Sequence, residues 1–338
     1  MKVLVRVRAP SNIALIKYMG KSDSSVNLPA NPSLSLTLDA LCTMTEIEFH
    51  PGGAFRLDWE GADAMEGVAL RPLRLKESDR PKMGRHFSRV LAHFGAPFEG
   101  HWTVRTGNAF PAGAGIASSA SGFAALTLAI ASALGKGTAP RGELAALSRQ
   151  GSGSSCRSFE GPWVEWRDAE AAPVASNFEP LSDLVVLVEE TEKTVGSSEA
   201  HLRVRTSPLW KGRVERANAR LESIRAALSS ADWGLLSRTC WEEAMDMHEL
   251  FHTAAPSFSY WTPRTREILA WLESIGANAA KVKMAVTLDA GPNIHLLVPR
   301  HDEAFWMDRI EERFPGTSVL SDRQGSGAKV LFRREIPA

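Results

Sequence analysis

Apolar residues recur every three or four positions in several segments of the chain, which is the spacing of one face of an α-helix. Phe87 and Leu91 belong to one such segment. Residues 118–134 are mostly small, which favours a helix that packs closely against its neighbours. Pro263 after Thr262 marks another helix start. The pattern predicts helices at residues 87–94, 118–134, 211–227, 241–251, 264–275 and 302–313.

Alternation of apolar and polar residues marks the beginning of the chain. Val3, Val5 and Val7 share one face of a predicted strand. A continuous apolar run at 183–188 predicts a buried strand, which we expect to begin a second domain. Further strands are predicted at 281–288, 294–298 and 329–332. Strands and helices are mixed along the chain without a regular alternation.

Composition and charge narrow the function classes. The 338 residues are enough for two domains, and 39 Lys and Arg residues balance 39 Asp and Glu residues. This balance gives no electrostatic reason to expect nucleic acid or a membrane surface as a partner, so attraction for a polyanionic substrate must be local. Three widely spaced cysteines are typical of the reducing cytoplasm. We expect no signal peptide and no membrane span.

The segment Asn108-Ala-Phe-Pro-Ala-Gly-Ala-Gly-Ile-Ala-Ser-Ser-Ala-Ser-Gly122 places a glycine-rich turn directly before the small-residue helix. Gly113 and Gly115 allow a ligand to approach the backbone, and free amides at a helix start attract anions. Ser118 and Ser119 add hydroxyl groups for phosphate oxygens or Mg²⁺. The segment lacks the Gly-Lys-Ser/Thr ending of a Walker loop. It is either another kind of phosphate-binding turn or a tightly packed helix start.

Three further segments carry single charged residues in unusual surroundings. Arg157 lies in the glycine- and serine-rich residues 149–158, where its guanidinium could bind a carboxylate or phosphate, or where the segment could be a linker. Lys17 lies in an apolar run, from which a lysine commonly extends to solvent. Asp289 precedes a Gly-Pro turn and could be a turn former. It becomes a catalytic candidate only if the fold brings it to the phosphate-binding turn.

Taken in order, these segments resemble the mevalonate diphosphate decarboxylases of the GHMP kinase superfamily over nearly the whole chain. The motifs that carry the resemblance are Ala9-Pro-Ser-Asn-Ile-Ala, Lys17-Tyr-Met-Gly-Lys21, Leu28-Pro-Ala-Asn-Pro-Ser-Leu-Ser-Leu-Thr-Leu38, Phe110-Pro-Ala-Gly-Ala-Gly-Ile-Ala-Ser-Ser-Ala-Ser-Gly-Phe-Ala-Ala125, Gly151-Ser-Gly-Ser-Ser-Cys-Arg-Ser158 and Leu288-Asp-Ala-Gly-Pro-Asn293. Met19 and Pro32 depart from the family pattern, in which Trp and Ser or Thr are usual.

The resemblance implies an α+β protein with the GHMP kinase fold. Residues 1–182 would form a ribosomal-protein-S5-domain-2-like N-terminal domain that binds nucleotide and substrate. Residues 183–338 would form a ferredoxin-like C-terminal domain that carries the catalytic aspartate. The active site would lie in the cleft between them. A homodimer in the cytoplasm is also expected.

The resemblance also implies a reaction: ATP-dependent decarboxylation of mevalonate 5-diphosphate to isopentenyl diphosphate, with ADP, phosphate and CO₂ as the other products. The implied catalytic residues are Asp289, Lys17 and Arg157. Substrate would be bound by Lys17, Tyr18, Lys21, Ser152, Ser154 and Arg157. ATP would be bound by Pro111, Gly113, Gly115, Ile116, Ala117, Ser118 and Ser119, with Ser118 and Ser119 also able to ligate Mg²⁺.

Two alternatives stay open at this point. A GHMP kinase of the same branch could phosphorylate a mevalonate 3-hydroxyl without decarboxylation, and release of CO₂ separates the two activities. The chain could instead be a catalytically idle nucleotide-binding homologue. The combination of Lys17, Arg157 and Asp289 favours decarboxylation, because an idle protein has no chemical need for all three.

Overall fold

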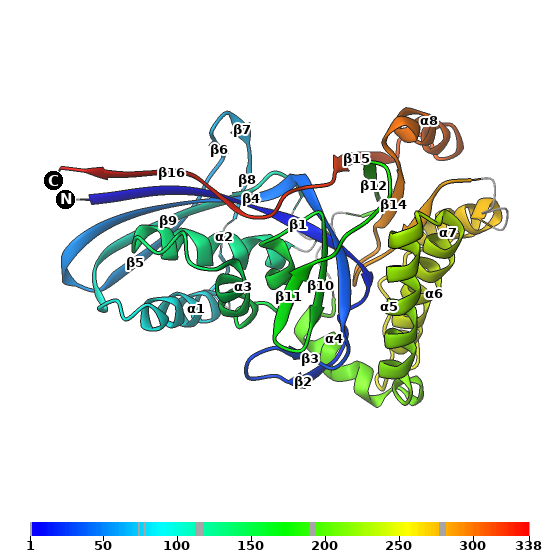
Figure 1. Cartoon of the computed structure of the whole chain (residues 1–338), viewed down its shortest axis with the longest axis horizontal. Helices are drawn as coiled ribbons and strands as arrows, with labels where there is room; N and C mark the ends of the chain where they lie inside the picture. Colours follow the sequence, from blue (N-terminus) through cyan, green and yellow to red (C-terminus); the bar gives the residue numbers. More distant parts are fainter. Residues whose placement is uncertain are drawn as a thin grey trace.

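The computed structural model describes residues 2–73, 75–77, 79–111, 116, 118–189, 194–276 and 282–337. Over these residues the chain forms two β-sheets with helices packed against them (Figure 1). The helices are α1 (Arg80–His93), α2 (Ser118–Ala133), α3 (Arg141–Arg149), α4 (Ser197–Arg203), α5 (Arg213–Ser230), α6 (Trp233–His252), α7 (Pro263–Gly276) and α8 (Glu303–Arg313). In the described residues, no helix combines the length and the apolar character needed to cross a membrane.

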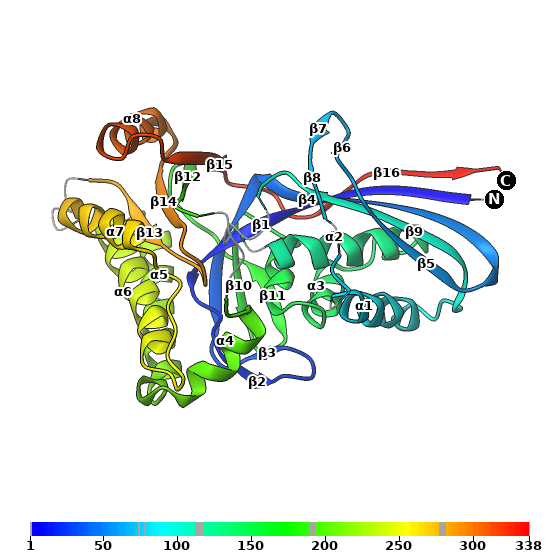
Figure 2. The same cartoon turned by 180° about the vertical axis from the view of Figure 1, so that it is seen from behind.

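The larger sheet contains both ends of the described chain. Its eight strands are β1 (Lys2–Ile16), β4 (Ser33–Ala54), β5 (Arg56–Gly61), β8 (Arg71–Pro72), β9 (Glu99–Asn108), β10 (Trp163–Arg167), β11 (Glu170–Pro173) and β16 (Lys329–Ile336). Strand β1 lies between β4 and β16 and is antiparallel to both, so the two termini lie side by side (Figures 1 and 2).

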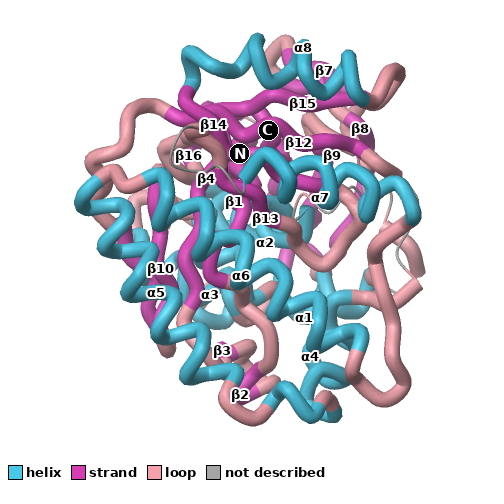
Figure 3. Tube along the Cα trace, turned by 90° about the vertical axis from the view of Figure 1, so that its right-hand side faces the viewer, coloured by secondary structure: helices cyan, strands magenta, loops and turns pink. Residues whose placement is uncertain are grey.

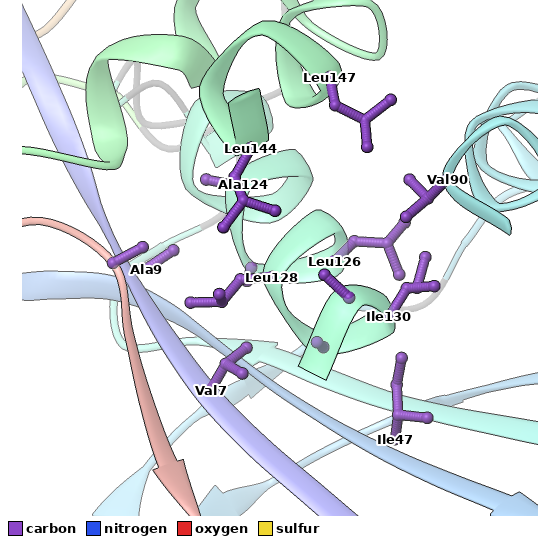
Figure 4. Packing of buried hydrophobic residues seen from close by; sticks show 14 of the residues in the cluster. Val7, Ala9, Ile47, Val90, Ala124, Leu126, Leu128, Ile130, Leu144 and Leu147 are labelled. Atoms are coloured by element: carbon purple, nitrogen blue, oxygen red, sulfur yellow. The ribbon is translucent and has the colours of Figure 1, made fainter. Parts of the chain in front are cut away.

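Helix α2 packs against one face of this sheet. Its small residues allow the helix to approach the sheet closely, and nearly all of them are buried. Figure 4 shows Val7 and Ile47 of the sheet next to Leu128 and Ile130 of α2, with side chains of α1 and α3 beyond them. The alternating burial in the first half of β1 follows from this one-sided packing.

The second half of β1 is buried on both faces. There Ile13, Leu15 and Ile16 pack in a cluster with side chains of α5 and α6, and Val185 of the smaller sheet joins the same cluster. The end of β1 therefore lies where both sheets and the helix pair meet. This position brings Lys17, the residue after β1, close to elements from the second half of the chain.

The smaller sheet has the strand order β13, β14, β12, β15. Its strands are β12 (Leu181–Leu187), β13 (Ala285–Thr287), β14 (Ile294–Pro299) and β15 (Ser318–Arg323). Leu184 and Val186 pack with side chains of α7 and α8. Helix α8 lies beside β15 at one end of the molecule, and α5 and α6 run side by side (Figure 3). Two short hairpins, β2 (Lys21–Asp23) with β3 (Leu28–Pro29) and β6 (Ala64–Met65) with β7 (Val68–Ala69), complete the strands.

The six helices predicted from apolar spacing are all present, with somewhat different ends. The strands predicted at 183–188 and 294–298 correspond to β12 and β14. Of the strand predicted at 281–288, only Ala285–Thr287 is a strand, and Lys281 lies outside the described residues. The last predicted strand, β16, pairs with β1 in the larger sheet, although it falls within the predicted C-terminal domain.

Candidate active site

A cavity of about 360 Å³ lies where the end of β1 meets α1, α2, α4, α6 and the turn after β13. Eight of the residues predicted to form the site line it: Lys17, Tyr18, Lys21, Ser119, Ser152, Ser154, Arg157 and Asp289. These residues come from four distant segments of the sequence. Asp289 thus shares this cavity with Ser119, which among the described residues of the predicted nucleotide segment is the one that lines it.

Lys17 and Asp289 both line this cavity and form an ion pair. Lys17 Nζ lies 2.8 Å from Asp289 Oδ1 and donates a second hydrogen bond to the Ala14 carbonyl at 2.5 Å. The Lys17 side chain is 1% exposed and that of Asp289 is 23% exposed, so the carboxylate is the partner that a ligand can reach. Lys17 does not extend to solvent as an isolated lysine in an apolar run commonly would.

Opposing effects act on the pKa of Asp289. Burial raises it, whereas the charge of Lys17 and the hydrogen bond from that residue lower it, and the net result is a pKa below the ordinary aspartate value. The carboxylate is therefore ionised at neutral pH. It can accept a hydrogen bond from a ligand hydroxyl, but it is a weak base.

Arg157 also lines the cavity, and it lies in a 3₁₀ helix formed by Gly153–Ser158. It is buried, and burial lowers its pKa. Nε donates to Ser35 Oγ at 3.1 Å and to Asn12 Oδ1 at 3.3 Å, NH1 donates to Ser33 Oγ at 2.6 Å, and NH2 donates to Asn12 Oδ1 at 3.2 Å. These bonds engage three of the five N–H groups of a guanidinium. The remaining two can donate to a ligand.

The turn before this 3₁₀ helix brings hydroxyl groups to the cavity. Ser152 Oγ donates to Ser119 Oγ at 3.2 Å, which joins the turn to the first residues of α2. Gly153 packs against the ring of Tyr18 so closely that an added Cβ would lie 2.6 Å from Tyr18 Cε1. A glycine is therefore required between Ser152 and Ser154 for the tyrosine to occupy its place.

Tyr18 and Lys21 line the side of the cavity that faces α4. The Tyr18 ring lies 4.6 Å from the Trp166 ring and 4.4 Å from the His201 ring, measured between centroids. Burial raises the pKa of Tyr18, and its hydroxyl has no hydrogen-bond partner among the described residues. Lys21 Nζ donates to Asn27 Oδ1 at 2.7 Å, and burial lowers the pKa of this lysine.

The predicted nucleotide segment is described only in part. Gly113, Gly115 and Ala117 lie outside the described residues. Pro111 and Ile116 are buried, and the Ile116 carbonyl accepts a hydrogen bond from Ser11 Oγ. Neither these two residues nor Ser118 is among those that line the cavity, whereas Ser119 is.

Several cavity residues were not predicted from the sequence. Lys82, Arg85 and Arg89 extend from α1, and His201 extends from α4. The three basic residues recur at helical spacing on a different face from Phe87 and Leu91, so this polar pattern could have indicated them. His201 Nδ1 accepts a hydrogen bond from the Gly20 amide at 2.9 Å, and burial lowers the pKa of His201 to about 3.

Comparison with known proteins accounts for both halves of the chain. A family model for the diphosphomevalonate decarboxylase-like N-terminal domain matches residues 9–176, and one for the mevalonate 5-diphosphate decarboxylase C-terminal domain matches residues 183–333. The diphosphomevalonate decarboxylase of Ganoderma lucidum is 30% identical, and the match covers 94% of this chain and 84% of that protein.

Solved structures are similar over almost the same extent. The crystal structure of a mevalonate diphosphate decarboxylase from Legionella pneumophila has a TM-score of 0.82 and 36% sequence identity, and the match covers 94% of this chain and 100% of the other. A structure described as MDDEF in complex with MVAPP, AMPPCP and magnesium has a TM-score of 0.84 and 29% identity, with coverage of 98% and 99%. The predicted α+β class and GHMP kinase fold are confirmed by these similarities. The chain belongs to the family of the mevalonate diphosphate decarboxylases.

Proposed function

We propose that the chain catalyses the ATP-dependent decarboxylation of mevalonate 5-diphosphate to isopentenyl diphosphate, with ADP, phosphate and CO₂ as the other products. The observation that carries this proposal is the convergence of Lys17, Asp289 and Arg157 on one cavity. The names of the relatives and the ligands of the similar MDDEF structure support the same activity.

Asp289 would act on the 3-hydroxyl group of the substrate. Its carboxylate is ionised and reachable from the cavity, so it can accept the hydroxyl proton and align the oxygen with the γ-phosphorus of ATP. Because its pKa is lowered, alignment contributes at least as much as proton removal. The ammonium group of Lys17 would hold the carboxylate in place and offset negative charge during phosphoryl transfer.

Arg157 would bind the substrate carboxylate. The hydrogen bonds to Asn12, Ser33 and Ser35 use three of its five N–H groups, so two are available for the substrate. A guanidinium can bind a carboxylate through two parallel bonds. After phosphorylation, the bond from C3 to the phosphate oxygen and the bond from C2 to the carboxylate carbon break. The electron pair of the second bond forms the new double bond, and phosphate departs with the first pair. Arg157 would keep these two bonds aligned.

The other groups would bind phosphates. Lys21, Tyr18, Ser152 and Ser154, which line the cavity, would donate to the substrate diphosphate. ATP would be bound by Ser119 and by the segment with Pro111, Gly113, Gly115, Ile116, Ala117 and Ser118. In the described residues there is no cluster of three His, Cys, Asp or Glu side chains suited to a metal. Mg²⁺, which neutralises phosphate charge when bound, would therefore be held by ATP oxygens with help from the hydroxyl groups of Ser118 or Ser119.

Three broader properties are proposed with the function. These are a division into domains at residues 1–182 and 183–338, a homodimeric state and a cytoplasmic location. Buried free thiols at Cys42, Cys156 and Cys240 support a reducing compartment. Sedimentation velocity tests the dimer, which a single monomeric species over a range of concentrations would contradict.

A substrate panel tests the activity. The purified protein is incubated with MgATP and with mevalonate, its 5-phosphate or its 5-diphosphate, and kcat/KM is measured for ADP formation and for CO₂ release. We expect both products, with the highest kcat/KM for the diphosphate. Preference for another substrate would contradict the assignment of mevalonate 5-diphosphate, and absence of both products in every reaction would support an idle homologue.

A further inference from the structure

A buried ion pair lies directly behind Lys17 and outside the cavity. Arg213, the first residue of α5, and Glu243, in the middle of α6, are both 0% exposed. Arg213 NH1 donates to Glu243 Oε2 at 2.9 Å, and NH2 donates to Glu243 Oε1, so the pair is bidentate. Arg220 also donates to Glu243 Oε2 at 3.0 Å.

The same two side chains bind both backbone polar groups of Lys17. The Lys17 amide donates to Glu243 Oε1 at 3.0 Å, and the Lys17 carbonyl accepts from Arg213 NH2 at 3.3 Å. Asn31 Nδ2 donates to this carbonyl at 2.9 Å as well. The backbone of Lys17 is thus held by the charged side chains of Arg213 and Glu243, which lie more than 190 positions later in the chain.

Stability alone is a poor reason for such an arrangement. Two charges lose much hydration when they are buried, and a buried ion pair can often be replaced by apolar side chains with little loss of stability. A charged pair does, however, fix the direction of the groups that it binds, because charge-assisted hydrogen bonds are short and directional. The groups that Arg213 and Glu243 bind, and whose direction they can fix, are the amide and the carbonyl of Lys17.

We propose that the Arg213–Glu243 pair is a positioning device that fixes the backbone of Lys17 and so holds its ammonium group against Asp289. The proposal rests on the proposed function, in which Lys17 and Asp289 act together. The Lys17 side chain is 1% exposed, so the surrounding residues leave it little room to compensate for a backbone shift by changing rotamer. A shift of the backbone therefore moves the ammonium group away from the carboxylate.

Thr287 connects β13, which precedes Asp289, with the end of β1, which precedes Lys17. Its hydroxyl donates to the Ala14 carbonyl at 3.1 Å, the same oxygen that accepts from Lys17 Nζ. Thr287 ends β13 two residues before Asp289, so β13 is tied to the end of β1 at this point. With Arg213 and Glu243 behind the backbone, Lys17 is held from both sides.

Displacement of Lys17 has a consequence that simple loss of stability does not have. In the described part of the chain, the charged or titratable groups that act on Asp289 include Lys17, Arg157, His295 and the buried His248. Of these, Lys17 is the one that forms an ion pair with the carboxylate. If the ammonium group moves away, the carboxylate is harder to ionise, and the acidic limb of the pH profile of kcat moves to higher pH.

Glu243→Gln tests the proposal, with Asp246→Asn as the matched control. The glutamine keeps the shape of the side chain but has one acceptor oxygen where Glu243 has two charged ones. Asp246 accepts hydrogen bonds from Arg213 and from Arg220 in the same cluster but has no contact with Lys17 among its hydrogen bonds and ion pairs. Both variants weaken the ion cluster. Only Glu243→Gln removes the charge of the carboxylate that accepts a hydrogen bond from the Lys17 amide.

Two measurements are made on both variants. Hydrogen–deuterium exchange of the Lys17 amide needs no substrate, and we expect it to be faster in Glu243→Gln and unchanged in Asp246→Asn. The kcat for mevalonate 5-diphosphate should fall by about tenfold or more in Glu243→Gln, with the acidic limb at higher pH, because small displacements of catalytic groups have large effects. In Asp246→Asn we expect kcat within about twofold of the wild type, with an unmoved limb.

Unchanged exchange in folded Glu243→Gln would overturn the proposal, and so would faster exchange with unchanged kcat and pH profile. If Glu243→Gln does not fold, Arg213→Lys replaces it, because lysine keeps the positive charge but cannot bind Glu243 and the Lys17 carbonyl with the same fork. In that variant too, unchanged exchange of the Lys17 amide, or faster exchange with unchanged kcat and pH profile, would overturn the proposal. An inactive wild-type protein would instead refute the proposed function, and the exchange data would still report whether the pair holds the Lys17 backbone.

Discussion

Replacement of Arg157 by lysine separates charge from geometry at the proposed carboxylate site. The substitution keeps a positive charge, but it exchanges a planar group with five N–H donors for a single nitrogen with three. In the wild type, three of the five donors bind Asn12, Ser33 and Ser35, and two remain for a ligand. A lysine ammonium group cannot serve these partners and a carboxylate at the same time.

The expected magnitude follows from these contacts. A hydrogen bond to a charged group contributes about 1.5–3 kcal/mol, so the loss of one of two bonds to the substrate carboxylate lowers kcat/KM by about 10- to 150-fold. Loss of the bonds to Asn12, Ser33 and Ser35 should also lower the free energy of unfolding, because the three N–H donors of a lysine cannot replace all of them. The affinity for ATP should not change, because the proposed nucleotide groups are different residues.

Steady-state kinetics with mevalonate 5-diphosphate give kcat and KM for Arg157→Lys. Calorimetric titration with ATP and a denaturant unfolding curve serve as controls for the nucleotide site and the fold. A folded variant with unchanged ATP affinity and a kcat/KM within about threefold of the wild type would refute the carboxylate role of Arg157.

Three further predictions concern other walls of the cavity. Asp289→Asn should lower kcat by about a hundredfold or more while ATP affinity measured by calorimetry is retained; near-normal turnover would make the carboxylate a turn former only. Gly153→Ala places a Cβ against the Tyr18 ring, so KM for the diphosphate should rise, and an unchanged KM would contradict a role of Tyr18 in substrate binding. The lowered pKa of Asp289 means that activity is present above this pKa and is lost as the pH falls through it. In Lys17→Met the acidic limb of kcat should therefore lie at higher pH, and an unmoved limb would contradict the coupling of the two residues.

Local pattern predicted the longer amphipathic helices because each buries one face, and the small residues of 118–134 predicted the almost fully buried α2, but the pattern did not predict the shorter helices α3 and α4. The helix predicted at 264–275 lies within α7, and the one predicted at 211–227 overlaps α5 from Arg213 onward. The pattern did not predict the long strand β4 or the pairing of β16 with β1. Both features depend on partners that are distant in the sequence, and local spacing carries no information about which strands pair.

The candidate site was predicted through motifs, and its geometry was not. The four segments indicated Lys17, Arg157 and Asp289, but the ion pair of Lys17 with Asp289 joins positions 272 residues apart. Spacing alone gave no sign of Arg213 and Glu243 behind Lys17, because charged residues on a helix usually lie in solvent. Their burial follows from the packing of α5 and α6 against the end of β1, which only the tertiary structure specifies.

The stoichiometry of a single reaction tests the central claim most directly. Mevalonate 5-diphosphate labelled in its carboxyl carbon is incubated with the wild-type protein and MgATP, and ADP and labelled CO₂ are measured in the same samples over time. The proposed function predicts equal amounts of ADP and CO₂ at every time point. Formation of ADP with a stable 3-phosphorylated product and without labelled CO₂ would contradict it and would identify the protein as a kinase.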